Sequence, residues 1–215
     1  MSAKERKLTE KEQKRATEFE KLSRKMLDDG YSQRDLTIGI LYANMMALFV
    51  ACPVVILLGI VYVMVHPEDG NLLIVFEDRY LIFAITFFIS IIVLTVLHEL
   101  IHGLTWAFFT EKHWKSISFG VIWSALTPYC TCNEPLNKNE YILGSIAPTV
   151  ILGLAPMLIA IVVGSPFLFL LGAMMYLGGG GDMMIILKML RFKANGSEVL
   201  YFDHPYKVGL IVFEK

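Results

Sequence analysis

The chain has 215 residues, of which 55% are hydrophobic and 18% are charged, and its formal net charge is −1. This composition excludes an ordinary soluble domain of this length and indicates a helical protein that crosses a membrane several times. We therefore expect the lipid bilayer as a partner and expect no nucleic acid. The net charge itself says little, because the distribution of charge matters more in a membrane protein.

The first 38 residues are basic and contain ten Lys and Arg side chains. The positive-inside rule places this segment, residues 1–38, in the cytoplasm. Within it, residues 9–29 mix charges of both signs and carry Phe19, Leu22 and Met26 at intervals of three and four residues, which predicts an amphipathic helix. We expect a solvated or membrane-surface helix, with a partner-binding helix as the alternative.

Four later segments are apolar and at least as long as the roughly 20 residues that cross a bilayer. They are residues 40–65, 80–109, 141–163 and 166–190. We expect an α-helical polytopic membrane protein with about four transmembrane helices in residues 39–190 and a cytoplasmic C-terminal tail, residues 191–215. Pro148 and Pro156 predict kinks or local unwinding in the third span.

The charges of the two loops that follow the first two spans predict the orientation of the chain. The first loop is acidic, with Glu68, Asp69, Glu77 and Asp78, and the second is basic, with Lys112, Lys115 and Lys138. Because positive charge marks the cytoplasmic side, both termini are expected in the cytoplasm.

The segment between the second and third spans, residues 110–140, is too polar to cross the membrane and too apolar to be disordered. Residues 117–123 alternate in part and contain β-formers, and Gly120 and Pro128 punctuate the segment. We expect a short β-hairpin or strand in this cytoplasmic loop. Unpaired backbone groups cannot face lipid, so the segment must pack on protein or line a watered cavity, and it is a candidate wall of an active site.

The second apolar segment contains His98-Glu99-Leu100-Ile101-His102, an HExxH motif. Three ionisable groups are costly at membrane depth, and a metal site would explain them. On a helix, residues four apart share one face, so His98 and His102 can direct ring nitrogens at one ion. Glu99 is displaced around the helix and is expected to be the general base for a water that zinc makes more acidic.

Two other interpretations of the motif stay open. The histidines could be structural, hydrogen-bonded to neighbouring helices, with Glu99 neutral or paired. Haem binding fits the spacing poorly, because two axial ligands must approach opposite faces of the iron. His98 and His102 share one helix face, so at most one of them could bind a given haem.

Asp182 is the candidate for the third protein ligand that a catalytic zinc ion usually has. Outside the HExxH motif, it is the ionisable side chain that lies deep in a predicted span between residues 80 and 190, if the tyrosines and the near-terminal Lys188 are set aside. At 1.5 Å per residue, Asp182 and His102 both lie about 10–12 Å from the cytoplasmic ends of their helices. The preceding glycine run, residues 178–181, permits close helix approach or local unwinding. The alternative role is a helix cap or an interhelical hydrogen bond.

The remaining candidate ligands have simpler explanations. Surface solvation accounts for Glu134 and Glu140 in the loop. Cys130 and Cys132 form a CxC pair, which would bind a soft metal only with further cysteines, so a structural or incidental role is expected. The histidines outside the spans are expected to be ordinary polar surface; they are His66, His113 and His204.

The chain resembles the putative zincin peptidases, small prokaryotic membrane proteins, over about residues 80–190. The resemblance rests on His98 to Gly103, on Tyr129-Cys130-Thr131-Cys132-Asn133-Glu134-Pro135, on Ala147-Pro148 and on Gly181-Asp182. More distantly, the chain is similar to the site-2 protease class of intramembrane metalloproteases. That class implies zinc on His98, His102 and Asp182 with Glu99 as the base. Asp182 departs from the class pattern, in which the aspartate precedes a glycine and follows an asparagine-proline element.

We therefore expect a zinc-dependent intramembrane metalloprotease in a prokaryotic cell membrane. It would hydrolyse peptide bonds of membrane-anchored proteins near the cytoplasmic side of the bilayer. The alternative is a non-catalytic zinc-binding membrane protein, namely a pseudo-protease, a structural metal site or a metal transporter. A structural site would have four protein ligands, and a transporter would need a polar path to the outer face.

Overall fold

The structure is a computed structural model that describes residues 8–70, 80–122 and 127–215. Some of the residues named above lie outside these ranges. They are part of the basic N-terminus (residues 1–7), the acidic Glu77 and Asp78 of the first loop, and Trp123 at the end of the expected strand.

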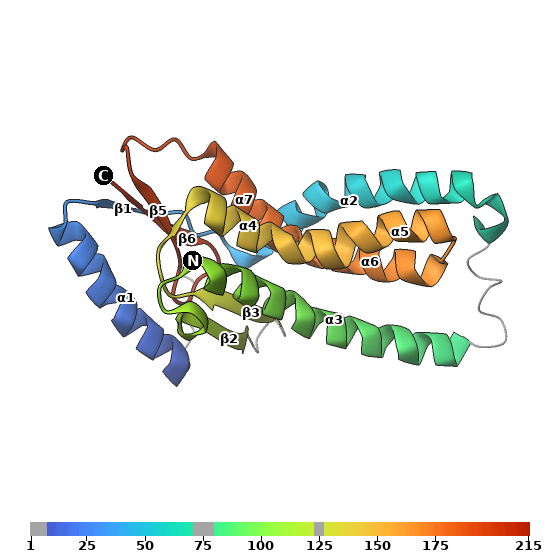
Figure 1. Cartoon of the computed structure of the whole chain (residues 1–215), viewed down its shortest axis with the longest axis horizontal. Helices are drawn as coiled ribbons and strands as arrows, with labels where there is room; N and C mark the ends of the chain where they lie inside the picture. The colour runs from blue at the N-terminus through green and yellow to red at the C-terminus, as the bar shows by residue number, and fades with distance from the viewer. Residues whose placement is uncertain (1–7, 71–79, 123–126) are drawn as a thin grey trace.

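The molecule is elongated, with apolar helices at one end and a small sheet with an N-terminal helix at the other (Figure 1). The helices of the bundle are α2 (Ile40–Val65), α3 (Tyr80–Phe109), α4 (Lys138–Pro148), α5 (Ala155–Val163), α6 (Pro166–Gly178) and α7 (Gly180–Arg191). The other end contains α1 (Glu10–Asp28) and the strands β1 (Ser32–Asp35), β2 (Ile117–Ile122), β3 (Thr127–Cys132), β4 (Leu136–Asn137), β5 (Val199–Asp203) and β6 (Leu210–Glu214). Shorter helical segments are η1 (Pro67–Gly70), η3 (His113–Ser116) and η4 (Thr149–Leu154).

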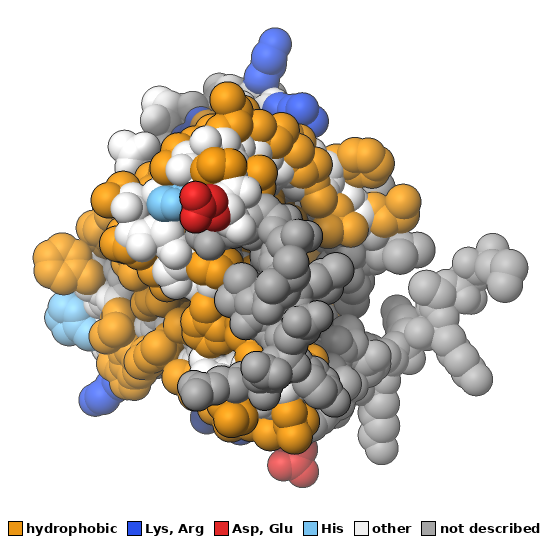
Figure 2. Space-filling view, turned by 90° about the vertical axis from the view of Figure 1, so that its right-hand side faces the viewer, with side chains coloured by type: hydrophobic (Ala, Val, Ile, Leu, Met, Phe, Trp, Pro, Cys, Tyr) orange, Lys and Arg blue, Asp and Glu red, His pale blue; other side chains and the backbone are white. Residues whose placement is uncertain are grey.

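The described chain has three to four candidate membrane-spanning helices. Three segments are long and apolar enough, namely Met45–Val65, Leu81–Phe109 and Lys138–Val163, and α6 with α7 forms a fourth candidate that bends by 44°. The outer side chains of α3 suit a lipid environment, since Phe88 and Val96 expose 67% and 65% of their surface. Figure 2 looks onto the end at which α2 ends and α3 begins, and hydrophobic side chains predominate on the described surface there.

The third candidate span is irregular between its two prolines. α4 ends at Pro148, the backbone is π-helical from Thr149 to Leu154, and Pro156 lies in the first turn of α5. Proline has no backbone N–H and its ring crowds the preceding turn, so regular helical hydrogen bonding is interrupted. The predicted local unwinding is confirmed.

The fourth candidate span is broken inside its glycine run. α6 ends at Gly178, α7 begins at Gly180, and Gly179 lies between them. A methyl group at Gly180 would lie 2.8 Å from Ala47 Cβ, so this glycine allows α7 to approach α2 closely. Asp182 consequently lies in the first turn of α7.

The loop between the second and third spans forms the expected β-hairpin. β2 and β3 pair antiparallel, with Ile117 opposite Cys132 and Gly120 opposite Tyr129. The hairpin packs on α3 beside Gly103, where a side-chain carbon would lie 2.7 Å from the ring of Phe119. It therefore lies against the part of α3 that carries the HExxH motif.

The structure also contains a four-stranded antiparallel sheet in the order β1-β6-β5-β4, which was not predicted from the sequence. β1 precedes α2, whereas β5 and β6 come from the end of the chain (Figure 1). The register places Ser32 opposite Glu214 and Leu136 opposite Tyr201. α1 packs on this sheet, where the ring of Phe19 contacts those of Phe202 and Phe213. The C-terminal segment thus folds back onto the strand that leads into α4.

Candidate metal centre

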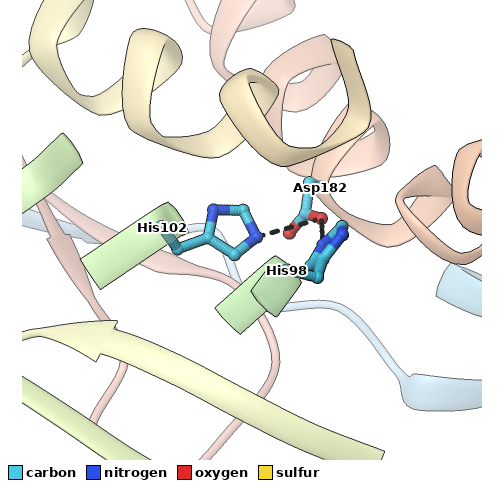
Figure 3. A group of neighbouring side chains, drawn as sticks. All are labelled: His98, His102 and Asp182. Carbon is cyan, nitrogen blue, oxygen red and sulfur yellow. Dashed lines mark hydrogen bonds and ion pairs between the residues drawn. The ribbon is translucent and has the colours of Figure 1, made fainter. Parts of the chain in front are cut away.

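Two histidines of α3 point toward the same place (Figure 3). His98 and His102 are four residues apart, so the helix places them on one face, one turn from each other. Both are buried, with 7% and 3% of their surface exposed. Their ring centroids are 4.8 Å apart, and each ring directs its Nε2 atom at Asp182.

Asp182 reaches the two histidines from the first turn of α7. Its Oδ2 atom lies 3.2 Å from Nε2 of His98 and 3.4 Å from Nε2 of His102. The ligand atoms of the three residues all lie within 4.8 Å of one another. The structure therefore brings together all three residues that the sequence predicted as ligands.

These distances suit a tetrahedral zinc site. Zinc bonds of about 2.0–2.2 Å to nitrogen and oxygen, at tetrahedral angles, place neighbouring ligand atoms about 3.4 Å apart. The two separations from Asp182 Oδ2, 3.2 and 3.4 Å, are close to that value. Two imidazoles and a carboxylate are also ligands that zinc commonly binds, and three protein ligands leave a position for water.

The hydrogen bonding of His102 gives an independent reason to expect a cation at this point. Its Nδ1 lies 2.8 Å from the carbonyl oxygen of Gly144, and because a carbonyl only accepts, Nδ1 carries the hydrogen. In a neutral imidazole Nε2 is then an acceptor, and it faces the Asp182 carboxylate, which is also an acceptor. A positive charge between them, either a proton or a metal ion, removes this conflict. The same hydrogen bond selects the tautomer that a metal ligand needs.

His98 is held less firmly than His102. Its Nδ1 is buried and has no hydrogen-bond partner in the part of the chain that the structure describes. Metal-binding histidines usually donate this second ring N–H to a neighbouring group, which fixes the orientation of the ring. His102 is therefore the better oriented of the two predicted ligands.

Glu99 lies beside His98, His102 and Asp182 but does not belong to this group of candidate ligands. Its side chain is partly buried, lines the same cavity, and faces the backbone N–H of Cys130 in β3. Its carboxylate oxygens are not among the mutually close ligand atoms. This position suits a group that acts on a water or a substrate next to a metal better than it suits a fourth ligand.

A cavity of about 680 Å³ adjoins the metal group. Its walls come from α1, α2, α3, the hairpin, α6, α7 and residues 203–209. Apolar side chains such as Leu48 and Met174 line it among the helices, and Arg15 and Lys207 line it beside the sheet. The site is therefore open to an elongated ligand that has both apolar and polar parts.

The residues that orient His102 were not predicted. Its imidazole stacks on Trp106, with ring centroids 5.1 Å apart, and its Nδ1–H is donated to Gly144 of α4. Trp106 follows His102 by four residues, so the spacing that pairs the two histidines also indicates this neighbour. A backbone carbonyl such as that of Gly144 leaves no signal in the sequence.

One histidine outside the spans is not the polar surface residue that was predicted. His204 is buried, with 8% of its surface exposed, and its Nδ1 accepts hydrogen bonds from the backbone N–H groups of Tyr206 and Lys207. Burial and, to a smaller extent, the positive charge of Lys207 lower the pKa of His204 to about 4. The prediction was wrong because this residue holds the turn between β5 and β6.

The other candidate ligands stabilise local structure. Glu134 accepts hydrogen bonds from the backbone N–H groups that follow α3, and Glu140 forms a capping box with Asn137 at the start of α4. Cys130 and Cys132 are unpaired. Burial raises the pKa of the Cys132 thiol to about 12, so it stays protonated at neutral pH.

The comparison with known families agrees with this geometry. Residues 91–196 match a family model described as putative zincin peptidase. This part of the chain is similar to that family. The matched segment begins within α3 and ends after α7, so it includes His98, Glu99, His102 and Asp182. The zincin description implies a zinc metallopeptidase. No curated protein and no solved structure matches the chain.

Proposed function

We propose that the chain is a zinc-dependent intramembrane metallopeptidase, similar to the site-2 protease class, that acts on membrane-anchored proteins. The observation that supports this most directly is the convergence of His98, His102 and Asp182 beside Glu99. This convergence lies within helices that are long and apolar enough to cross a membrane. We assign the first three residues as zinc ligands and Glu99 as the general base.

The chemistry of the proposed reaction divides between the metal and Glu99. A bound zinc ion would polarise the substrate carbonyl and make a water molecule more acidic. Glu99 accepts a proton from that water, and the water oxygen adds to the carbonyl carbon. When the C–N bond breaks, Glu99 passes the proton to the leaving amine. Each turnover consumes one water and returns Glu99 to its starting state.

The walls of the cavity support a substrate that is anchored in the membrane. α2, α3 and α6 are parts of candidate spans, and their apolar side chains line the cavity next to the metal group. A peptide that enters from the bilayer can keep apolar side chains against residues such as Ile91 and Leu48, while its scissile carbonyl faces Glu99. A hydrophilic peptide gains less from these walls.

The orientation of the chain forms part of the proposal. Lys112, Lys115 and Lys138 lie after α3 or at the start of α4, at the end of the molecule that carries α1 and the sheet (Figure 1). Positive charge near the ends of spans marks the cytoplasmic side. We infer a cell membrane protein with α1 and the sheet in the cytoplasm and with the metal group nearer that side.

The non-catalytic alternative is less well supported. A structural zinc site has four protein ligands, whereas the group found among the described residues supplies three. The adjoining cavity gives space for a substrate, and the family description is that of a peptidase.

The test uses the full chain in detergent micelles and in proteoliposomes. Two probes are offered: labelled casein, and a single-span reporter with a fluorescent pair on either side of the cytoplasmic end of its span. We expect stoichiometric zinc by elemental analysis, preferential cleavage of the reporter, loss of cleavage with a chelator, and recovery when zinc is restored.

Glu99→Gln separates metal binding from catalysis. This variant is expected to bind zinc as the wild type does and to cleave neither probe. Glu68→Gln makes the same chemical change on the exposed turn η1 and should retain full cleavage. Undiminished cleavage by Glu99→Gln, or a wild-type chain without zinc, would contradict the proposal.

A further inference from the structure

We propose that Asp203 is a positioning residue for the metal site, and that the C-terminal strands help to orient His102. Asp203 ends β5, beyond the segment that matches the peptidase family, and it is not one of the three candidate ligands. The inference rests on the proposed function, because it concerns how the same site is held in place.

Asp203 connects three elements through one buried carboxylate. Only 8% of its surface is exposed. Its Oδ2 atom accepts a hydrogen bond of 2.8 Å from the backbone N–H of Cys132 at the end of β3, and Oδ1 accepts one from the hydroxyl of Tyr141 in α4. A buried carboxylate is costly unless its oxygens are hydrogen-bonded. The Cys132 backbone and the Tyr141 hydroxyl are therefore held beside the end of β5.

Tyr141 connects Asp203 to the ring that supports His102. The tyrosine is buried, with 1% of its surface exposed, and its carbonyl oxygen accepts a hydrogen bond of 3.3 Å from Nε1 of Trp106. The indole of Trp106 stacks on the imidazole of His102. One tyrosine therefore binds the carboxylate of β5 through its hydroxyl and the indole of α3 through its backbone.

Gly144 provides the second connection between α4 and His102. It lies almost one turn after Tyr141, and its carbonyl oxygen accepts the Nδ1–H of His102 at 2.8 Å. A side chain at Gly144 would overlap the indole of Trp106, so α4 rests directly on that ring. Any shift of α4 therefore moves both the stack and the hydrogen bond that orient His102.

Strand pairing in the sheet also restrains the start of α4. β4 ends at Asn137, immediately before α4, and pairs with β5 so that Leu136 lies opposite Tyr201 and Asn137 opposite Leu200. Asp203 lies two residues after Tyr201 on the same strand. The backbone pairing and the Asp203 side chain together fix where α4 sits on α3.

The expected effect of replacing Asp203 is moderate, because this residue supports His102 indirectly. Replacing a residue that directly supports a metal ligand typically lowers metal affinity by 10–100-fold. Asp203 acts through Tyr141 and α4, so Asp203→Ala is expected to lower zinc affinity by about 10-fold, at the lower end of this range. Asp203→Asn keeps an acceptor for the backbone N–H of Cys132, because the amide oxygen can replace one carboxylate oxygen. We expect this variant to lower zinc affinity by about threefold or less.

Glu214→Ala is the matched control. Glu214 is also a buried carboxylate of this sheet, with 4% of its surface exposed, and it binds Arg34 and the backbone N–H of Asn195. It lies on β6 opposite Val199 and Ser32, so its contacts are with strands and a loop and not with α4. Its loss should destabilise the sheet while leaving zinc affinity within about twofold of the wild type.

The experiment measures the full chain in micelles by two readouts that do not depend on cleavage. Zinc affinity is obtained by competition with a chromophoric chelator. In metal-free protein, nitrogen NMR of labelled imidazoles reports whether Nδ1 of His102 is still protonated and hydrogen-bonded. We expect Asp203→Ala and Tyr141→Phe to weaken this hydrogen bond, and Glu214→Ala to leave it unchanged.

A double substitution tests whether the two residues act along one route. If Asp203 works through Tyr141, the double variant Asp203→Ala with Tyr141→Phe loses no more zinc affinity than the more affected single variant. Additive losses, or equal losses in Asp203→Ala and Glu214→Ala, would overturn the inference while leaving the proposed function intact. Should Asp203→Ala fail to fold, Asp203→Asn and Tyr141→Phe carry the comparison, and wild-type affinity in both would overturn it. A wild-type chain that binds no zinc would overturn the proposed function together with the inference.

Discussion

The indole of Trp106 lies parallel to the imidazole of His102, with an interplanar angle of 14° and ring centroids 5.1 Å apart. Trp106 is 4% exposed, and its Nε1 donates to the carbonyl oxygen of Tyr141. The stack covers one face of the imidazole while Gly144 binds its edge, so His102 is restrained from two directions. A candidate ligand held in this way is already oriented before a metal ion binds.

Trp106→Leu should weaken zinc binding through this stack. The change removes both the aromatic face and the N–H donor, and we expect the Kd for zinc to rise by about 10-fold, as for other residues that support metal ligands. The measurement is chelator competition with the purified full chain. Trp114→Leu is the control, because Trp114 is 47% exposed on η3 and contacts Phe119. Equal Kd values for the two variants would show that the stack does not orient His102.

The glycines before Asp182 offer a matched pair of substitutions. A methyl group at Gly180 would lie 2.8 Å from Ala47 Cβ and 3.0 Å from its carbonyl oxygen, whereas one at Gly181 would meet nothing within 4 Å. Gly180→Ala should push α7 away from α2 and displace Asp182, at a cost of about 1–3 kcal/mol from overpacking. Gly181→Ala should be neutral or slightly stabilising, by up to about 1 kcal/mol, because alanine favours a helix.

Thermal unfolding and zinc affinity together check this pair. We expect Gly180→Ala to lower both the unfolding temperature and the zinc affinity, and Gly181→Ala to leave the affinity unchanged. If the two variants behaved alike, the close contact between α7 and α2 would not be what positions Asp182.

The features predicted from the sequence are those carried by local patterns. α2 and α3 begin and end at the predicted residues because long apolar runs bounded by polar residues define helices in a membrane. The HExxH spacing places both histidines on one face, and the depth of Asp182 along its span matches that of His102. These inferences need only helix geometry, and the structure brings the three residues together.

The four-stranded sheet was missed because its pairing depends on distant segments. β1 has the sequence Ser-Gln-Arg-Asp and is exposed at every position, so it carries no apolar alternation. Its partner β6 lies near the other end of the chain, and no local signal links Ser32 to Glu214. The apolar runs of β5 and β6 do indicate strands, but neither the register nor the contact of Asp203 with α4 follows from them.

Asp182→Asn directly tests the proposed role of Asp182 as the third ligand. The amide keeps the shape of the side chain but removes the negative charge that faces His98 and His102 at 3.2 and 3.4 Å. We expect zinc affinity to fall by more than about 100-fold, because residues that merely support ligands account for losses of 10–100-fold. Asp28→Asn at the exposed end of α1 makes the same change and should have no effect. Zinc affinity within tenfold of the wild type in Asp182→Asn would assign the third ligand elsewhere.

Asp203 should also make stability depend on pH. Burial raises the pKa of this carboxyl to about 6, against its ordinary value of 3.8. Hydrogen bonds from Tyr141 and the Cys132 backbone, and the nearby charges of Arg15 and His102, act in the opposite direction and reduce the rise. Between these two pH values the folded chain therefore binds more protons at this position than the unfolded chain does. The stability gained from protonated Asp203 is complete below about pH 4 and is lost as the pH rises through about 6.

Asp203→Asn removes this titration while the neighbouring His204, with its pKa lowered to about 4, contributes equally to both proteins. The unfolding temperature of the metal-free wild type should therefore fall relative to that of Asp203→Asn as the pH rises from 4.5 to 6.5. Above about pH 7 the difference should stay constant, because Asp203 is then ionised in both the folded and the unfolded chain. The check is thermal unfolding of both proteins in the same detergent across this range. If the difference in unfolding temperature does not change with pH, Asp203 ionises as it would in water. The burial of its side chain between β5 and α4 would then not be maintained in solution.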